Sequence, residues 1–185
     1  YRYYVQLQAN DKEFTVRFAE SLRRILRDDI PIRYHKYPYH KTGRWAVIKG
    51  NKGFSTWYNS LTLNQISDML TTKELAAEYI RGFFDSEGSV LVRKRKPVNL
   101  SISNTSIDNL KMTKALLDKF FLIRSCTYAG NTSQGRPVYQ LRIGRWDDVL
   151  KFVQEVGITI ERKLTKICDC CERINRFGSA ITPIE

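Results

Sequence analysis

Glu87 and Asp85 are the acidic residues whose placement predicts chemistry, because they end an apolar helical pattern in LAAEYIRGFFDSEGSVLV, residues 75–92. We expect Gly88 to stop that helix by adopting a left-handed conformation, which makes Glu87 its last residue. The C-terminal end of a helix is electronegative, so an acid there is unfavourable unless a cation lies beside it. Mg²⁺ takes oxygen ligands, usually one or two carboxylates with phosphate and water. The segment therefore predicts a divalent metal ion bound at Glu87.

Gly82 and Ser86 lie four residues apart on one face of the same predicted helix, with Tyr79 close by. Small residues at this spacing let two helix backbones approach closely. If a second helix of this kind packs here, two acids meet at the end of the pair. Two carboxylates that hold metal ions beside a phosphate form a phosphodiesterase site. The alternative is an ordinary tight helix pair.

The elements that must position these acids occur in two sets of the same order: strand, helix, hairpin, helix. Polar and apolar alternation predicts the strands, and apolar residues at helical spacing predict the helices. Leu22 and Leu117 occupy matching helix positions 95 residues apart, which indicates an internal duplication. The first set has a strand at 1–8, a helix at 12–27, a hairpin at 32–38 and 44–49, and a helix near 55–61. The second has a strand at 98–103, a helix at 106–121, a hairpin at 123–128 and 138–143, and helices at 146–156 and 159–177.

The composition points to a folded protein with an anionic partner. The 185 residues include 31 Lys and Arg against 19 Asp and Glu, a net charge of +12, and 42% are hydrophobic, which excludes a disordered or low-complexity chain. No apolar run approaches the ~20 residues of a membrane span and no signal-like start is visible, so we expect a soluble, intracellular protein. The excess of positive charge favours nucleic acid as the partner over another anionic surface or none.

The four cysteines do not predict a metal site. Cys126 stands alone, whereas Cys168, Cys170 and Cys171 lie together in CDCC. A tetrahedral zinc site needs two spaced ligand pairs, and CDCC is too cramped to supply them. Buried or free thiols near a helix end are the favoured interpretation, and a disulfide stays open.

The stretch YIRGFFDSEG, Tyr79 to Gly88, resembles the LAGLIDADG motif of homing endonucleases. The element order across 75–177, αββαββα, is similar to the half-domain of that family, and residues 1–74 resemble a first half-domain without its motif helix and first strand. The resemblance implies an α+β fold of duplicated αββαββα half-domains with antiparallel saddle-shaped sheets, one at 1–74 and one at 75–185. It is closest to the single-chain, two-motif archaeal intron-encoded enzymes.

The partner acid that the family takes from its first motif has no counterpart in residues 1–74. Relative to the second half, the first lacks about 21 residues, which correspond to one helix and one strand. We expect the missing motif upstream of Tyr1, with a separate piece or dimerisation as the alternatives. The expected assembly is a monomeric pseudo-dimer, with a homodimer second.

In this family the penultimate acid of the motif binds the catalytic metal, so the resemblance implies that Glu87 binds Mg²⁺ or another divalent cation such as Mn²⁺ or Ca²⁺. Asp85 takes the earlier acid position, where capping and helix packing are the favoured role. Four further residues are candidates for the site, and for each of them a structural role is the alternative. Gln8 and Asn104 resemble the amide that orders the water of the metal, and Lys73 and Lys163 resemble the lysine that stabilises charge on the phosphate.

The family lays its sheets along the major groove of DNA, where Arg favours guanine and Gln or Asn favours adenine. Counting in steps of two from Glu87 assigns Leu91, Arg93 and Arg95 to the face that meets the groove. A solvated sheet face is the alternative. The matching rows on other strands are Arg2, Tyr4, Gln6 and Gln8; Arg33, His35 and Tyr37; Asn99, Ser101 and Ser103; Gln140 and Arg142. The basic residues expected at phosphates are Lys94, Lys96, Arg136, Lys163 and Lys166.

Together, these expectations predict a site-specific double-strand DNA endonuclease of intron-encoded type that hydrolyses phosphodiesters with a divalent metal. Its expected partner is double-stranded DNA and not a membrane, in the cytoplasm of an archaeon or in an organelle. One alternative is a maturase that assists splicing of its own intron RNA, which would not need Glu87. The other is a catalytically inactive DNA-binding module, because the chain holds only one motif.

Overall fold

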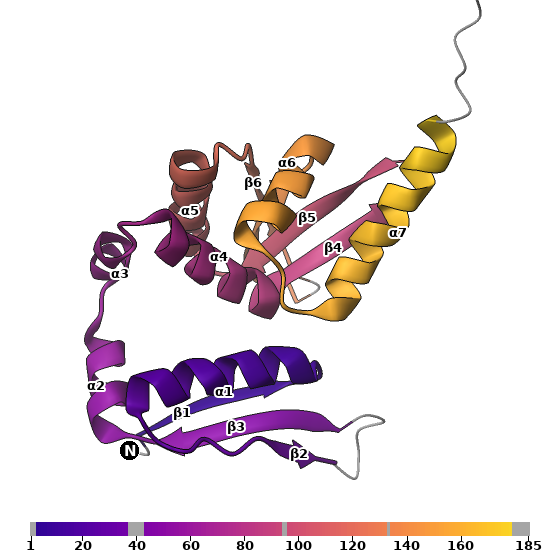
Figure 1. Ribbon diagram of the computed structural model, residues 1–185. Helices are drawn as coiled ribbons and strands as arrows, with labels where there is room; N and C mark the ends of the chain where they lie inside the picture. Colours follow the sequence, from indigo (N-terminus) through magenta and orange to yellow (C-terminus); the bar gives the residue numbers. More distant parts are fainter. Residues whose placement is uncertain (1–2, 37–42, 94–95, 133, 179–185) are drawn as a thin grey trace, which may run out of the picture. The chain divides into compact units, whose positions relative to one another are not determined.

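The computed structural model describes residues 3–36, 43–93, 96–132 and 134–178 (Figure 1). The chain folds as two compact units, Tyr1–Ile66 and Ser67–Glu185. The division lies eight residues before the boundary expected at 74/75. None of the described helices is both long and apolar enough to span a membrane.

The first unit is a three-stranded antiparallel sheet with the strand order β1-β3-β2, covered by α1. Leu22 and Ala19 of α1 are buried against Val47 of the central strand, because apolar residues of the helix recur on one face. The strand, helix and hairpin expected here are confirmed. The elements are β1 (Tyr4–Ala9), α1 (Lys12–Leu26), β2 (Arg33–His35), β3 (Arg44–Gly50) and α2 (Lys52–Ser60), and α3 (Leu63–Met69) crosses into the second unit.

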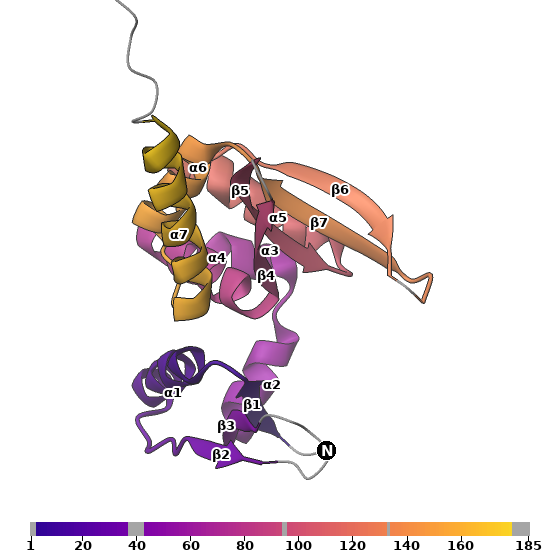
Figure 2. The ribbon, with the colours of Figure 1, turned by 90° about the vertical axis from the view of Figure 1, so that its right-hand side faces the viewer.

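The second unit is a four-stranded antiparallel sheet with the strand order β4-β5-β7-β6. Helices α4, α5, α6 and α7 all contact the central strand β5, and the β6–β7 hairpin extends away from α4 and α7 (Figure 2). The expected αββαββα order is confirmed. The elements are α4 (Lys73–Glu87), β4 (Gly88–Arg93), β5 (Lys96–Asn104), α5 (Ile107–Leu116) with a π-helical last turn (Leu117–Phe121), β6 (Cys126–Asn131), β7 (Pro137–Ile143), α6 (Trp146–Lys151) with a π-helical last turn (Phe152–Val156), and α7 (Glu161–Gly178).

The backbone supports the expected duplication in detail. Asp11 and Ser106, 95 residues apart, occupy the N-cap positions of α1 and α5. Arg27 and Leu122, also 95 residues apart, follow the ends of these helices in the left-handed conformation, with φ of 51° and 52°. That conformation is uncommon for residues other than glycine, so its recurrence at the same offset is specific.

Two local expectations need correction. Gly88 has φ −87° and ψ 154°, so the helix α4 ends in extended backbone and not in a left-handed residue. The strand β6 covers Cys126–Asn131 and not the expected 123–128, so residues 123–125 precede the strand and residues 129–131 extend it. Residues 129–131 are Ala, Gly and Asn, which show no apolar alternation, so a pattern based on apolar residues ended the strand early.

Candidate active site and nucleic-acid interface

Glu87 is the last residue of α4, as expected. The helix begins where the hydroxyl of Thr72 accepts a hydrogen bond from the backbone N–H of Leu75 at 3.3 Å. Ala76, Ile80 and Phe84 are fully buried at four-residue spacing, which orients the helix toward the sheet. The Glu87 side chain is exposed and makes no hydrogen bond or ion pair within the described part of the chain. Its carboxylate is therefore available to a ligand.

Gly88 lets the sheet begin directly after this helix. Its N–H donates to the Phe84 carbonyl, and a Cβ at this position would overlap the Phe84 carbonyl oxygen and lie 2.7 Å from the ring carbon Cε2. The glycine is thus required for a close approach of backbone to backbone. As a result, Glu87 lies at the junction of α4 and β4, with no intervening loop.

Lys163 of α7 caps the C-terminal end of α4. Its Nζ donates to the carbonyl oxygens of Phe84 at 2.7 Å and Asp85 at 2.9 Å, and its side chain is only 3% exposed. The same ammonium lies 4.9 Å from the centre of the Phe84 ring. A cation at this end of a helix offsets the negative end of the helix dipole. The cation required by the electrostatic argument for Glu87 is therefore Lys163, and that argument no longer requires a metal.

Asp85 has the packing role that the sequence favours. It is 4% exposed, and its carboxylate oxygens accept the backbone N–H of Thr159 at 3.1 and 3.2 Å. Burial raises the pKa of the Asp85 carboxyl above its ordinary value, against the opposing effects of the Thr159 hydrogen bond and the Lys163 charge. This carboxylate joins α4 to the segment that starts α7 and is not free to bind a metal.

Lys73 lies at the far end of α4 from Glu87, whereas Asn104 lies at the Glu87 end of the sheet, two residues beyond Ile102, which pairs with Gly88. Lys73 is the first residue of α4, where it pairs with Glu155 at 2.5 Å, and the helix rise places it about 21 Å from Glu87. The Asn104 side chain accepts the N–H of Ser106 at 2.8 Å in the turn before α5. Both residues have structural partners, and their catalytic roles stay predictions. Gln8, the fourth candidate, is exposed on β1 of the first unit.

The residues at the α4–β4 junction fit one ligand of a hard divalent cation. Glu87 supplies an exposed, unpaired carboxylate, the donor that Mg²⁺, Mn²⁺ and Ca²⁺ accept. The described residues contain no group of three or more His, Cys, Asp or Glu that could hold a metal ion. Phosphate oxygens, water and a further carboxylate would have to complete such a site.

The sheet of the second unit separates its buried face from a polar face. Leu100, Ile102 and Leu141 are at most 2% exposed on the face toward the helices. The strand register places all the described residues of the expected rows on the opposite face. They are Leu91 opposite Asn99, Ser101 opposite Arg142, and Ser103 opposite Gln140.

Two members of these rows are less accessible than expected. Ser101 is only 2% exposed, so it cannot reach a base. With its amide oriented to satisfy its neighbours, the Asn99 nitrogen lies 3.3 Å from the Val98 carbonyl and 3.2 Å from the Gly144 carbonyl. The Asn99 side chain is thus engaged with backbone carbonyl groups. The sequence pattern identifies the face of a residue but not the neighbours that cover it.

Arg142 and Gln140 form a cluster with Tyr128, a residue that the sequence reasoning missed. Arg142 donates from Nε at 3.2 Å and from Nη2 at 2.6 Å to Oε1 of Gln140. Its guanidinium lies 4.9 Å from the centre of the Tyr128 ring. Tyr128 lies on β6 directly opposite Gln140. Every residue of β6 is exposed, so this strand shows no burial alternation that could have identified its outward row.

The assignment of Arg93 lies beyond an irregularity of the sheet. The pairing of β4 with β5 shifts register between Leu91 and Arg93, which interrupts the count in steps of two. Arg2, Tyr37, Lys94 and Arg95 lie outside the described residues, as do the side chains of Arg93 and Lys96. Among the phosphate candidates, Arg136 and Lys166 are exposed, whereas Lys163 is buried as a helix cap.

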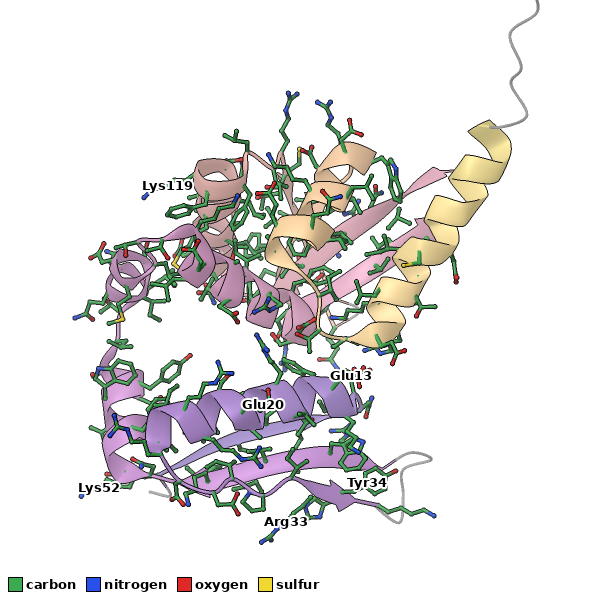
Figure 3. The ribbon with its side chains drawn as sticks, in the orientation of Figure 1. Glu13, Glu20, Arg33, Tyr34, Lys52 and Lys119 are labelled. Carbon is green, nitrogen blue, oxygen red and sulfur yellow. The ribbon has the colours of Figure 1, made fainter. Side chains whose placement is uncertain are left out.

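The sheet of the first unit also presents the expected row on one face. Gln8 and Arg33 both pair with Ala46, from its two sides, and Tyr4 and Gln6 alternate with half-buried residues along β1. Arg33 points away from α1 in Figure 3. The register places His35 opposite Arg44, so Arg44 also lies on this face. Counting every second residue along β3 would have identified it.

Comparison with known proteins supports this fold and identifies relatives of the chain. Residues 74–157 match the family model of the LAGLIDADG-like domain. An uncharacterized protein of Methanocaldococcus jannaschii is 30% identical over 121 residues, which are 63% of this chain and 46% of that protein. The chain therefore spans less than half of that relative.

A characterised relative and a solved structure resemble most of the chain. Homing endonuclease I-ApeI of Aeropyrum pernix is 25% identical over 182 residues, which are 89% of this chain and 76% of that protein. The crystal structure of I-DmoI in complex with DNA and Mn superimposes with a TM-score of 0.61 at 20% identity, covering 84% of this chain and 81% of that one. At that identity the likeness shows the fold.

Proposed function

This chain carries a LAGLIDADG-like domain over residues 74–157 and is related to an archaeal homing endonuclease, and on that premise we propose that it is a site-specific endonuclease that cuts both strands of a DNA duplex. The observation that carries the proposal is Glu87: an exposed carboxylate without a protein partner in the described chain, at the end of the domain's first helix. Its neighbour Asp85 is buried and hydrogen-bonded, so the two acids have separate tasks.

Glu87 would hold a divalent cation together with oxygens of the DNA and water. Such a cation, when bound, lowers the pKa of a coordinated water and stabilises charge on the phosphate that is attacked. The protein supplies the position: Lys163 and Gly88 fix the end of α4 from which Glu87 projects. Mg²⁺ is the ion we propose for this role, because it prefers carboxylate, phosphate and water oxygens.

The polar sheet faces would read the DNA. The chain has a net charge of +12, and Arg142, Gln140, Arg33 and Gln6 lie on sheet faces that no described helix covers. Two-stranded ribbons fit the major groove, where these side-chain types distinguish base pairs. We propose that the chain acts as a single-chain pseudo-dimer with one such face per half-site, and that the acid completing the site at Glu87 comes from a first motif.

The decisive experiment replaces Glu87 with Gln, which keeps the shape of the side chain and removes its charge. Duplexes selected by binding from a randomised DNA pool serve as substrate, with Mg²⁺. We expect Glu87→Gln to bind the selected duplex like the wild type and to lose cleavage of both strands. Glu74→Gln, an exposed acid in the first turn of the same helix, is the matched control and should cleave normally.

The same assay separates the alternatives. Wild-type protein that binds the duplex but does not cut it in Mg²⁺ would indicate a DNA-binding module. Binding restricted to structured RNA, unaffected by Glu87→Gln, would indicate a maturase. Cleavage at the wild-type rate by Glu87→Gln would show that this acid is not the metal ligand.

A further inference from the structure

The polar face of the second unit contains one cluster whose side chains are already bonded to each other. Arg142 and Gln140 are neighbours on the same face of β7, and Tyr128 lies opposite Gln140 on the edge strand β6. Arg142 donates twice to the Gln140 carbonyl oxygen, at 3.2 and 2.6 Å, and lies 4.9 Å from the centre of the Tyr128 ring. Tyr128 remains 49% exposed, so the cluster faces the surface.

The hydrogen bonds of the cluster decide which donors and acceptors remain. The Gln140 Oε1 has two lone pairs, and the two N–H groups of Arg142 occupy both. Gln140 therefore lacks the free acceptor that adenine recognition requires, since a glutamine reads adenine by accepting from N6 while donating to N7. What the pair still offers is donors: the Gln140 amide N–H groups, and the Nη1 and remaining Nη2 hydrogens of Arg142.

A surface that offers adjacent donors matches one base edge. In the major groove guanine presents two acceptors, N7 and O6, while adenine pairs an acceptor with a donor and cytosine presents a donor. The two terminal nitrogens of an arginine match N7 and O6 in one plane, and that planar fork makes the contact bidentate. The free end of Arg142 carries this fork.

Resting on the proposed function, we propose that Tyr128, Gln140 and Arg142 read a single guanine as one unit. Arg142 contacts the base, and Gln140 and Tyr128 are positioning residues. The Gln140 carbonyl holds the Nε edge of the guanidinium, whose central carbon lies over the Tyr128 ring. Both contacts form before DNA arrives, which reduces the side-chain entropy that ordering an arginine costs on binding. The general pairing of glutamine with adenine therefore does not apply to Gln140.

The first test examines the cluster without DNA. In the full chain, the Nε–H resonance of Arg142, identified by its absence in Arg142→Lys, should be displaced from those of exposed arginines. Gln140→Ala and Tyr128→Leu should each return it toward them, while Gln154→Ala and Tyr58→Leu, exposed residues of the same types, should leave it unchanged. An Arg142 resonance that already lies with the exposed arginines overturns the proposal.

The second test measures base preference by binding in Ca²⁺, with every single base-pair substitution of the selected duplex. Arg142→Ala should weaken discrimination at one G·C pair by about 5- to 150-fold. Gln140→Ala and Tyr128→Leu should weaken it at the same pair, and adding Gln140→Ala to Arg142→Ala should cost nothing further there. Tyr128→Phe keeps the ring and should retain the preference.

The outcomes separate this inference from the proposed function. If Gln140→Ala relaxes a different base pair and its effect adds to that of Arg142→Ala, the residues read independently and only this inference fails. If the chain selects no duplex at all from the pool, the proposed function fails and this inference fails with it.

Discussion

Lys163 and Asp85 join α4 and the start of α7 in both directions. Lys163, from α7, donates to the last carbonyls of α4, including that of Asp85 itself at 2.9 Å. Asp85, from α4, accepts the N–H of Thr159, two residues before α7 begins. The Lys163 charge faces the negative end of α4, and both side chains are buried. This reciprocal arrangement fixes the end of α4 two residues before Glu87.

Lys163→Met should destabilise the second unit by about 2–4 kcal/mol, because it leaves two helix-end carbonyls without their charged donor while keeping the aliphatic volume. Hydrogen exchange of peptides from β5 in increasing urea measures the loss. Lys166→Met, three residues further along the same helix and exposed, should change stability by less than about 0.5 kcal/mol. Equal effects of the two substitutions would contradict the capping role.

Asp85→Asn should change how stability depends on pH. Burial raises the pKa of the folded-state carboxyl above the ordinary 3.8. As the pH rises through 3.8, the unfolded chain ionises first, so the wild type loses stability relative to Asp85→Asn until the folded carboxyl has also ionised. Urea unfolding of both proteins across acidic to neutral pH measures the difference. A wild type that gains on the variant as the pH rises would show that Lys163 and Thr159 outweigh burial.

Gly88→Ala should destabilise the protein by more than 2 kcal/mol, on the order expected for overpacking, since its Cβ would overlap the Phe84 carbonyl. The backbone at Gly88 is extended, so conformational strain contributes nothing. The matched control is Gly82→Ala in the preceding helix, α4, where an added Cβ meets nothing within 4 Å. That change should stabilise α4 by about 0.5–1 kcal/mol. Thermal unfolding of both variants tests the pair, and similar effects would refute the close-approach argument.

DNA affinity should fall steeply with salt. A chain of net charge +12 that neutralises phosphates releases their counterions, so the logarithm of the binding constant should fall with that of the salt concentration with a slope of several units. Filter binding or fluorescence anisotropy between about 50 and 200 mM salt covers the range. A slope near zero would exclude phosphate contacts as the source of affinity.

The sequence alone determined the elements and the end of α4. Apolar periodicity is local: the helical spacing of apolar residues within 75–92 marks the helix, and the alternation in β5 separates Leu100 from Ser103. The repeat was visible because a duplicated chain keeps the same spacing, here 95 residues between Leu22 and Leu117. Such patterns depend on backbone geometry within a few residues, so no tertiary information is needed to read them.

Only the tertiary structure decided what the polar residues do. Lys163 reaches Phe84 across 79 residues of chain, Tyr128 meets Arg142 through strand register, and Ser101 is buried although it lies in the polar row. The register shift after Leu91 likewise comes from pairing with β5. A charged or polar side chain takes whichever partner the fold brings within hydrogen-bonding distance, and that distance has no periodic signature along the sequence.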